Sequence, residues 1–425
     1  MKKQLTYFLI TVTFLSLSAC GSANKVGTGD QSRKDDQTQS AITPNNSGWK
    51  TIETVSERNI IAKLEQTVEE TPKWNQTVQK VKESDDFKQG LYGKPTDDQA
   101  IEMAIQTVVG KTVIPLLEEI YEGYKGLDEA GVVFYDRKSM GAEQSGFWIG
   151  IKEPDDRLKK FITEMQKKID AGEIKAKYLH IFYTPYTTAE NNLLTDKVNE
   201  KVRAIVKNHE TPDRLAGGVS VDTITGNIEI EHNFLTEEQK KGLSNAFPTR
   251  KVVFHQQGRL VPKKGEKDTT YPEETYSKNP SKEGEYVMSL GDKGMLLISA
   301  QSTDFSETGG EKEFYSATRY KFPKASQKLH VGQRVKVEAS GPIMESYPGQ
   351  GTALYVDVLP EYKPHQADLS ESKVVQLGIK KAEDNQNHHI LSIRDLSYNK
   401  KADQWTIIFV RDKEVIEVVI PDEKM

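Results

Sequence analysis

The most informative part of the chain reads GEYVMS (284–289), MLLISA (295–300), EFYSATRY (313–320), RVKVEAS (334–340) and ALYVDVLP (353–360). These runs carry many β-branched and aromatic residues, which favour strands, and Gly, Pro, Asp and Ser lie between the runs. Several short strands separated by turn residues are typical of a small closed sheet. We therefore expect a small, OB-like β-barrel domain over residues 283–363.

The same region contains five ordered motifs: GEYVM (284–288), DFS (304–306), GGEKEFY (309–315), VGQRVKV (331–337) and SYPGQ (346–350). Together they make residues 283–360 resemble the YobA-like domain of unknown function found in bacilli and their relatives. The resemblance implies an exported, often lipid-anchored module built on a small β-barrel. It implies no activity and supplies no catalytic residues.

The last of these motifs opens a candidate binding loop, and we single out Tyr347 and Gln350. Loops at the mouth of a barrel often carry ligand contacts. Tyr347 offers an aromatic face and a hydroxyl group, and Gln350 offers amide donors and an acceptor. The alternative is an ordinary turn, in which Pro348 and Gly349 serve backbone geometry alone.

The segments around the barrel have their own patterns. A helix over residues 371–383, followed by strands over 389–398, 404–411 and 414–420, predicts a small α+β module over residues 371–425: a helix with a three-stranded meander. Residues 266–282 and 364–370 are expected to be linkers. The chain as a whole is predicted to be a multidomain α+β protein.

Residues 131–265 alternate between strand and helix patterns, which predicts an α/β sandwich domain. The clearest helix covers residues 155–172, where Leu158, Phe161, Met165 and Ile169 form one apolar stripe. Further in, a hairpin is expected over residues 219–222 and 227–231. A capping-box pattern from Thr236 to Gln239 opens a short helix after it.

This hairpin and helix carry a second resemblance. The sequence GVSVDT (218–223) with the following hairpin and helix is similar to the C-terminal lobe of bacterial serine-protease propeptides. The resemblance implies a protease-inhibitor or folding-assistant role. The alternative is a generic hairpin and helix of the kind that recurs in unrelated proteins.

Residues 49–130 are predicted to be a helical region. Ile61, Leu64 and Val68 would lie on one helical face, and after Pro72 the apolar spacing resumes from Trp74. Further helices are expected over residues 97–109 and 113–123.

One motif in this region invites a phosphate-loop interpretation. Gly110-Lys111-Thr112 matches the end of a P-loop, but Ile105 stands where that loop needs a glycine. We therefore expect Lys111 to be an ordinary charged residue of a helix or turn.

The N-terminal residues predict export. Two lysines precede an apolar run over residues 5–17, as in a signal peptide covering residues 1–19. The run ends in Leu17-Ser18-Ala19-Cys20, which resembles the lipobox of bacterial lipoproteins. That resemblance implies a palmitate-like lipid anchor on Cys20 and a place on the outer face of the cell membrane. Cys20 is the sole cysteine of the chain, so no disulfide framework can form.

Residues 20–48 would then be the lipid anchor and a polar tether, because this segment has almost no large apolar residue. Such tethers are common in lipoproteins of Gram-positive bacteria. The whole chain has 425 residues and a formal net charge of −5, which gives no electrostatic footprint for nucleic acid.

We find no motif that predicts catalysis, a cofactor or a metal. His180, His232 and His255 fall in the central segment and would form a metal site only if they converged; separate positions are the alternative. The sequence therefore favours a non-catalytic binding or scaffolding role for an envelope protein or polymer. A hydrolase acting on envelope material with an unrecognised site, and the propeptide-like role, remain the alternatives.

Overall fold

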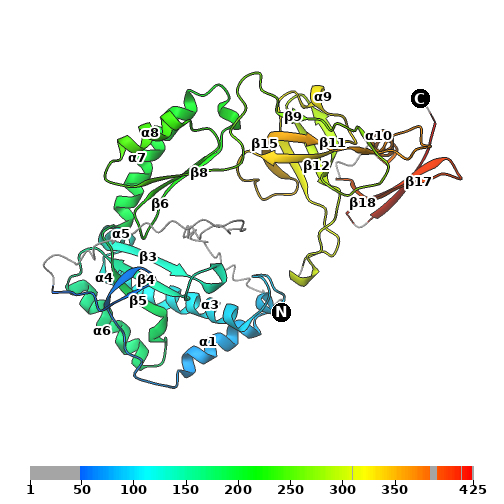
Figure 1. Cartoon of the computed structure of the whole chain (residues 1–425). Coiled ribbons are helices and arrows are strands. Elements are labelled where there is room, and N and C mark those ends of the chain that lie inside the picture. The colour runs from blue at the N-terminus through cyan, green and yellow to red at the C-terminus, as the bar shows by residue number, and fades with distance from the viewer. Residues whose placement is uncertain (1–47, 309, 383–389, 413, 424–425) are drawn as a thin grey trace, which may run out of the picture. The chain divides into compact units, whose positions relative to one another are not determined.

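The computed structural model describes residues 48–308, 310–382, 390–412 and 414–423. Residues 17–20, with Cys20 and the expected lipobox, lie outside this part, as do His388 and His389. The chain divides into two compact units, coloured along the sequence in Figure 1. The N-terminal unit comprises the described residues up to Leu194 with Asp222–Gly226, and the C-terminal unit comprises the rest.

The N-terminal unit is built on a sheet with the strand order β1-β2-β5-β4-β3. Strands β4 and β5 are parallel, and the other neighbours are antiparallel. The strands are β1 (Glu53–Val55), β2 (Arg58–Ala62), β3 (Gly131–Asp136), β4 (Gly146–Ile151) and β5 (Leu179–Tyr183).

The β1–β2 hairpin corrects one expectation, because Ile61, Leu64 and Val68 do not share a helix. Ile61 lies in β2, and the other two follow in an irregular segment. The two strands are joined by Ser56 and Glu57, both with positive φ, so the chain turns back within two residues. Pairing of β2 with β5 then places this hairpin in the sheet.

Helices cover one face of this sheet. They are α1 (Pro72–Glu83), α2 (Asp85–Lys88), α3 (Asp97–Val108), α4 (Ile114–Ile120), α5 (Tyr124–Ala130) and α6 (Asp156–Asp170). Ile105, Leu117 and Leu158 share one buried core with Ile149 of β4. The expected domain boundary between residues 130 and 131 therefore falls inside a single packed unit.

Helices α3 and α4 are continuous through a π-helical turn, Val109–Val113. The combined helix Asp97–Ile120 is long and apolar enough to cross a membrane by length and composition alone. In the fold, its residues Ala104, Ile105, Val113 and Leu117 are buried in the core of the N-terminal unit. This burial explains the apolar composition without a membrane.

Helix α7 (Thr188–Lys207) contains the division between the two units. After it, the C-terminal unit forms a lobe with the strand order β6-β7-β8. Its elements are β6 (Gly217–Val221), β7 (Ile228–His232), α8 (Glu237–Ala246) and β8 (Val252–Gln256). The capping box of Thr236 and Gln239 is confirmed. The single sandwich expected over residues 131–265 is wrong, because its strands belong to two sheets in different units.

The predicted barrel is confirmed as a closed, five-stranded sheet. Its strands are β11 (Glu285–Gly291), β12 (Gly294–Ser299), β13 (Ala317–Lys321), β14 (Arg334–Ala339) and β15 (Gly349–Val358). The order β13-β12-β11-β14-β15 closes on itself through the parallel pairing of β13 with β15. Helix α9 (Ala325–Lys328) lies between the third and fourth strands in sequence. Val287, Leu297 and Phe322 belong to the buried barrel core.

The linker expected over residues 266–282 is partly strand. In it, β9 (Thr269–Thr270) pairs in parallel with β15, and β10 (Tyr276–Ser277) pairs in parallel with β16 (Glu361–Tyr362). Two-residue strands are too short to give a periodic pattern, so composition alone indicated a linker. Short 3₁₀ turns occur at Lys138–Met140, Ala176–Tyr178, Pro212–Arg214 and Ser306–Thr308.

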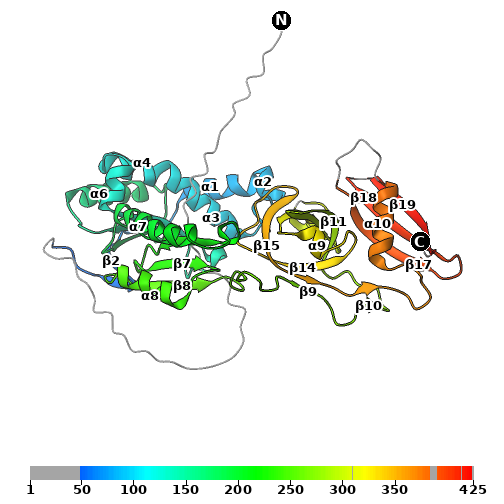
Figure 2. The ribbon, with the colours of Figure 1, turned by 90° about the horizontal axis from the view of Figure 1, so that it is seen from above.

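The C-terminal module has helix α10 (Glu371–Ala382) and the meander β17 (Ser392–Asn399), β18 (Gln404–Arg411) and β19 (Glu414–Pro421). Figure 2 shows α10 beside these strands. Val374 and Trp405 of this module share a buried cluster with Tyr286 and Ile298 of the barrel. Barrel and module therefore have a common core.

Candidate functional site

Two loops emerge at one end of the barrel. One connects β12 to β13, and the other, which contains Tyr347, connects β14 to β15. Because β13 and β15 are parallel and Thr318 pairs with Gly349, both strands begin at the same end of the barrel. Segments more than 30 residues apart in the sequence are thereby brought together.

Three aromatic side chains meet in these loops, and we call Phe305, Phe314 and Tyr347 the loop aromatic cluster. The ring centroids of Phe305 and Phe314 are 5.6 Å apart, and those of Phe314 and Tyr347 are 5.7 Å apart. Both distances lie in the range of favourable aromatic pairs. The Tyr347 hydroxyl donates a hydrogen bond to the Tyr315 carbonyl at 3.2 Å, which joins the two loops.

The cluster stays exposed to solvent. Phe305 and Tyr347 are 43% and 55% exposed, and the nearby Ile343 and Met344 are 41% and 67% exposed. Single exposed apolar side chains are ordinary, but several gathered on adjoining loops indicate a contact surface.

Backbone contacts hold both loops in shape. Thr303 pairs with Phe314 and Met344 pairs with Gln350 as isolated β-bridges. At Gly310, a side chain would place its Cβ 2.6 Å from the Cβ of Phe305, so only glycine lets the backbone pass this ring. The glycine-containing motif at 309–315 thus supports the position of Phe305.

Two phenol groups in these loops have raised pKa values. Burial raises the pKa of Tyr347. Burial and the hydrogen bond to Glu313 raise the pKa of Tyr315 to about 12. Both phenols therefore remain protonated near neutral pH and act as hydrogen-bond donors or acceptors.

The two residues singled out from the sequence have different places. Tyr347 belongs to the cluster, whereas Gln350 lies exposed on β15, where its backbone pairs with Met344 and its position opposes Arg319. A ligand contact by either side chain stays a prediction. Phe305 and Phe314 were missed as site residues, although both lie within the ordered motifs DFS and GGEKEFY.

The three central histidines do not converge. His180 stacks on Trp148 in the N-terminal unit, and burial lowers its pKa to about 4. His232 and His255 belong to the C-terminal unit, where His255 lies 3.5 Å from the Glu229 carboxylate. Across the described residues, no three His, Cys, Asp or Glu side chains are grouped to hold a metal ion.

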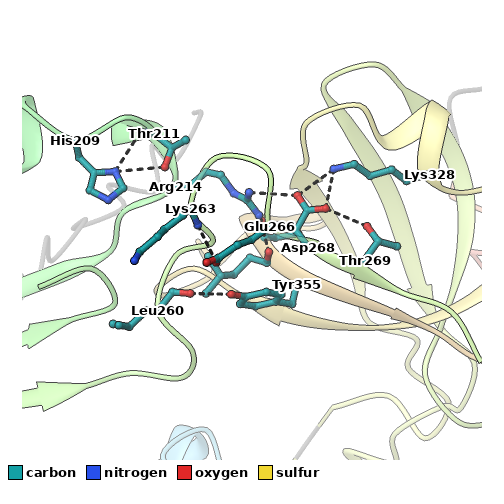
Figure 3. Close-up of polar contacts among 12 residues, drawn as sticks. His209, Thr211, Arg214, Leu260, Lys263, Glu266, Asp268, Thr269, Lys328 and Tyr355 are labelled. Carbon is teal, nitrogen blue, oxygen red and sulfur yellow. Dashed lines mark hydrogen bonds and ion pairs between the residues drawn. The ribbon is translucent and has the colours of Figure 1, made fainter. Parts of the chain in front are cut away.

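Polar contacts fasten the β6–β8 lobe to the barrel, as Figure 3 shows. The Arg214 guanidinium donates to the carbonyls of Ala353 and Leu354 on β15, at 3.2 and 2.5 Å. It also lies 3.3 Å from Asp268, which is 2.8 Å from the Lys328 ammonium. Arg214 is largely buried, so this network fixes the lobe against the barrel rather than offering a site.

A cavity of about 180 Å³ lies between the barrel and the C-terminal module, lined by Tyr286, Glu371 and Arg394 among others. The Glu371 carboxylate accepts hydrogen bonds from the Tyr286 hydroxyl at 2.6 Å and from Arg334 Nε at 2.9 Å. Its acceptors are thus occupied by the protein itself, and this cavity belongs to the domain junction.

Comparison with known proteins identifies one domain. Residues 283–360 match the family model described as a protein of unknown function, DUF3221. No curated protein matches the chain, and no solved structure matches it. The matched residues cover the barrel and both loops of the aromatic cluster.

Proposed function

We propose that this chain is a lipid-anchored extracytoplasmic protein that binds a protein partner at the cell envelope through its barrel loops. The observation that carries the proposal is the exposed loop aromatic cluster with Ile343 and Met344 beside it. Aromatic residues and Met are enriched in protein interfaces, and Tyr is a frequent binding hot spot.

The barrel supports a binding role. The barrel is closed and five-stranded, with a helix between its third and fourth strands, and we propose that it is OB-like. Such barrels bind ligands with their faces and loops, while the barrel itself stays rigid. The DUF3221 match and the YobA-like resemblance concern this same domain and name no reaction.

The binding surface is tested by site-specific photocrosslinking on intact cells. A photoreactive residue at Met344 should give a discrete protein adduct, and the double change Phe305→Ala with Tyr347→Ala should remove it. The matched control is Met140, which is 58% exposed but lies in the N-terminal unit. Equal adducts at both positions, or none at Met344, would contradict the proposal. A ladder of adducts at Met344 would show that the partner is an envelope polymer and not a protein.

The anchor is tested separately. Cys20→Ala should abolish incorporation of labelled fatty acid and release the chain into the medium, because stable anchoring needs two or more acyl chains. Ser18→Thr keeps the cysteine and should leave the chain in the membrane fraction. Unchanged membrane retention of Cys20→Ala would rule out the lipoprotein assignment.

A further inference from the structure

The N-terminal unit contains a cavity of about 480 Å³ between α1 and the helix that runs from α3 into the π-helical turn. Helix α1 packs beside α3 (Figure 1). Three lysines, four hydroxyl side chains and an apolar group surround the cavity. Its lining consists of Lys73, Thr77, Lys80, Val81, Ser84, Met103, Thr107, Val108, Lys111, Thr112 and Glu173.

The π-helical turn shapes one wall of this cavity. Pro115 has no N–H to bond the Lys111 carbonyl, so the regular α-helical pattern is interrupted there. The Ile114 N–H bonds the Val109 carbonyl instead, five residues back. Such π-bulges are frequent at functional sites. Here the bulge carries Lys111 and Thr112 to the cavity wall.

The charge around the cavity is positive. Glu173 is the one carboxylate of the lining, and it is engaged by Lys73 at 2.9 Å and by Lys168 at 3.2 Å. Within the described ranges, neither Lys80 nor Lys111 has a carboxylate within ion-pair distance. Two ammonium groups therefore face the cavity without a counter-charge from the described chain.

The inner surface is apolar. Val108 is buried, and Val81 and Met103 are half-buried beside it. The hydroxyls of Thr77 and Thr107 donate hydrogen bonds to the carbonyls of Lys73 and Met103 in their own helices. These two hydroxyl protons are therefore already used within the helices. The cavity thus combines an apolar floor with a cationic rim.

From this combination we infer that the cavity binds an anionic amphiphile: a phosphate or carboxylate head between Lys80 and Lys111, with an alkyl chain over Val81, Met103 and Val108. The Gly110-Lys111-Thr112 motif contributes a side-chain ammonium and a hydroxyl, not a P-loop cradle. This site is independent of the proposed partner surface on the barrel.

The test uses the chain from residue 20 onwards with Cys20→Ser, so that no covalent lipid contributes. Titration calorimetry with butyl, octyl and dodecyl phosphate, each below its micelle concentration, should show affinity rising with chain length, about fourfold for each buried methylene. Inorganic phosphate should bind far more weakly. Equal affinity for inorganic and dodecyl phosphate, or no binding of either, would overturn the inference.

Matched variants locate the site. Lys80→Gln with Lys111→Gln should weaken dodecyl phosphate binding at least about tenfold. Lys125→Gln removes one charge from α5 in the same unit, where the Lys125 side chain is 90% exposed, and should leave binding unchanged. Thermal midpoints should be the same for all variants. Binding unaffected by the double change, or equally reduced by Lys125→Gln, would refute the site.

Vesicles distinguish the source of the ligand. Binding to phosphatidylglycerol vesicles that the double lysine variant loses would identify a membrane lipid. Binding of monomeric dodecyl phosphate without binding to vesicles would identify a free amphiphile. Both results support the site, and vesicle binding retained by the double variant contradicts the lipid source.

Discussion

Glu285 is a carboxyl group in the wall of the barrel, next along β11 to the buried Tyr286. Successive side chains of a strand lie on opposite faces, so Glu285 lies on the same face of β11 as Val287 and on the opposite face from Tyr286. Val287 belongs to the barrel core. Burial raises the pKa of Glu285 from 4.5 to about 7. The folded barrel therefore favours the neutral carboxylic acid at this position.

The pKa of Glu285 predicts a pH-dependent stability. The pKa of Glu285 is higher in the folded than in the unfolded chain, so the protonated carboxyl stabilises the fold. This contribution to the free energy of unfolding is fully present below about pH 4.5 and is lost as the pH rises through about 7. The free energy of unfolding of the C-terminal unit should fall by up to about 3 kcal/mol over this range from this group. Urea unfolding at pH 5 and pH 8 measures it.

Glu285→Gln is the control for this prediction, since the amide keeps the shape of the acid and cannot ionise. The variant should be more stable than the parent at pH 8 and nearly equal to it at pH 5. A parent and a variant with parallel pH profiles would show that Glu285 ionises freely in the fold.

At the scale of elements, an ion pair joins strand β14 to helix α10. Arg334 and Glu371 lie 2.9 Å apart, and their side chains are 2% and 3% exposed. Arg334 also donates to the carbonyls of Glu283 and Pro360, and Glu371 accepts from the Tyr362 N–H. The pair thus closes the junction between barrel and C-terminal module.

Removing one partner of this pair leaves a buried charge. Glu371→Ala or Arg334→Met should each lower the free energy of unfolding by about 3–5 kcal/mol. The double variant Arg334→Met with Glu371→Leu should recover a large part of this loss, because no charge remains uncompensated. A double-mutant cycle in urea measures the coupling, and additive losses would show that the two charges act independently.

The elements that the sequence predicted well are those with a strong pattern of their own. The stripe from Leu158 to Ile169 gave α6, and the alternating runs gave the barrel strands. The β1–β2 hairpin was missed because Ser56 and Glu57 adopt positive φ, although neither is Gly, Asn or Asp. No local pattern signals such a turn, and the pairing of β2 with β5 that supports it is distant in sequence.

The candidate site was predictable only in part, for a similar reason. Tyr347 stood out through its loop of turn residues, but its neighbours Phe305 and Phe314 come from another loop. Their meeting depends on the parallel pairing of β13 and β15, which closes the barrel. A contact set by barrel closure leaves no spacing pattern in the sequence.

For the whole molecule, the two units have separate buried cores. Leu158 is fully buried in the core of the N-terminal unit, and Leu297 is fully buried in the barrel. Each unit therefore has its own source of hydrophobic stabilisation.

Separate cores predict two unfolding transitions in scanning calorimetry. Leu158→Ala should lower one transition and Leu297→Ala the other, each by about 2–5 kcal/mol in free energy of unfolding. Exposed changes such as Lys125→Gln should shift neither. One transition that both leucine variants lower equally would show that the units unfold as a single cooperative body.

The segment between the β6–β8 lobe and the barrel has a final consequence for the resistance of the protein to proteolysis. Its charged composition resembles a stretch that peptidases cut readily, with Lys267, Lys278 and Lys282 as basic cleavage points. Yet β9 lies against β15, β10 lies against β16, and the Tyr271 hydroxyl bonds the Lys328 carbonyl at 2.8 Å. A peptidase needs the chain as a free extended strand, and here parts of it are already paired. The segment should therefore resist nicking as long as the barrel stays folded.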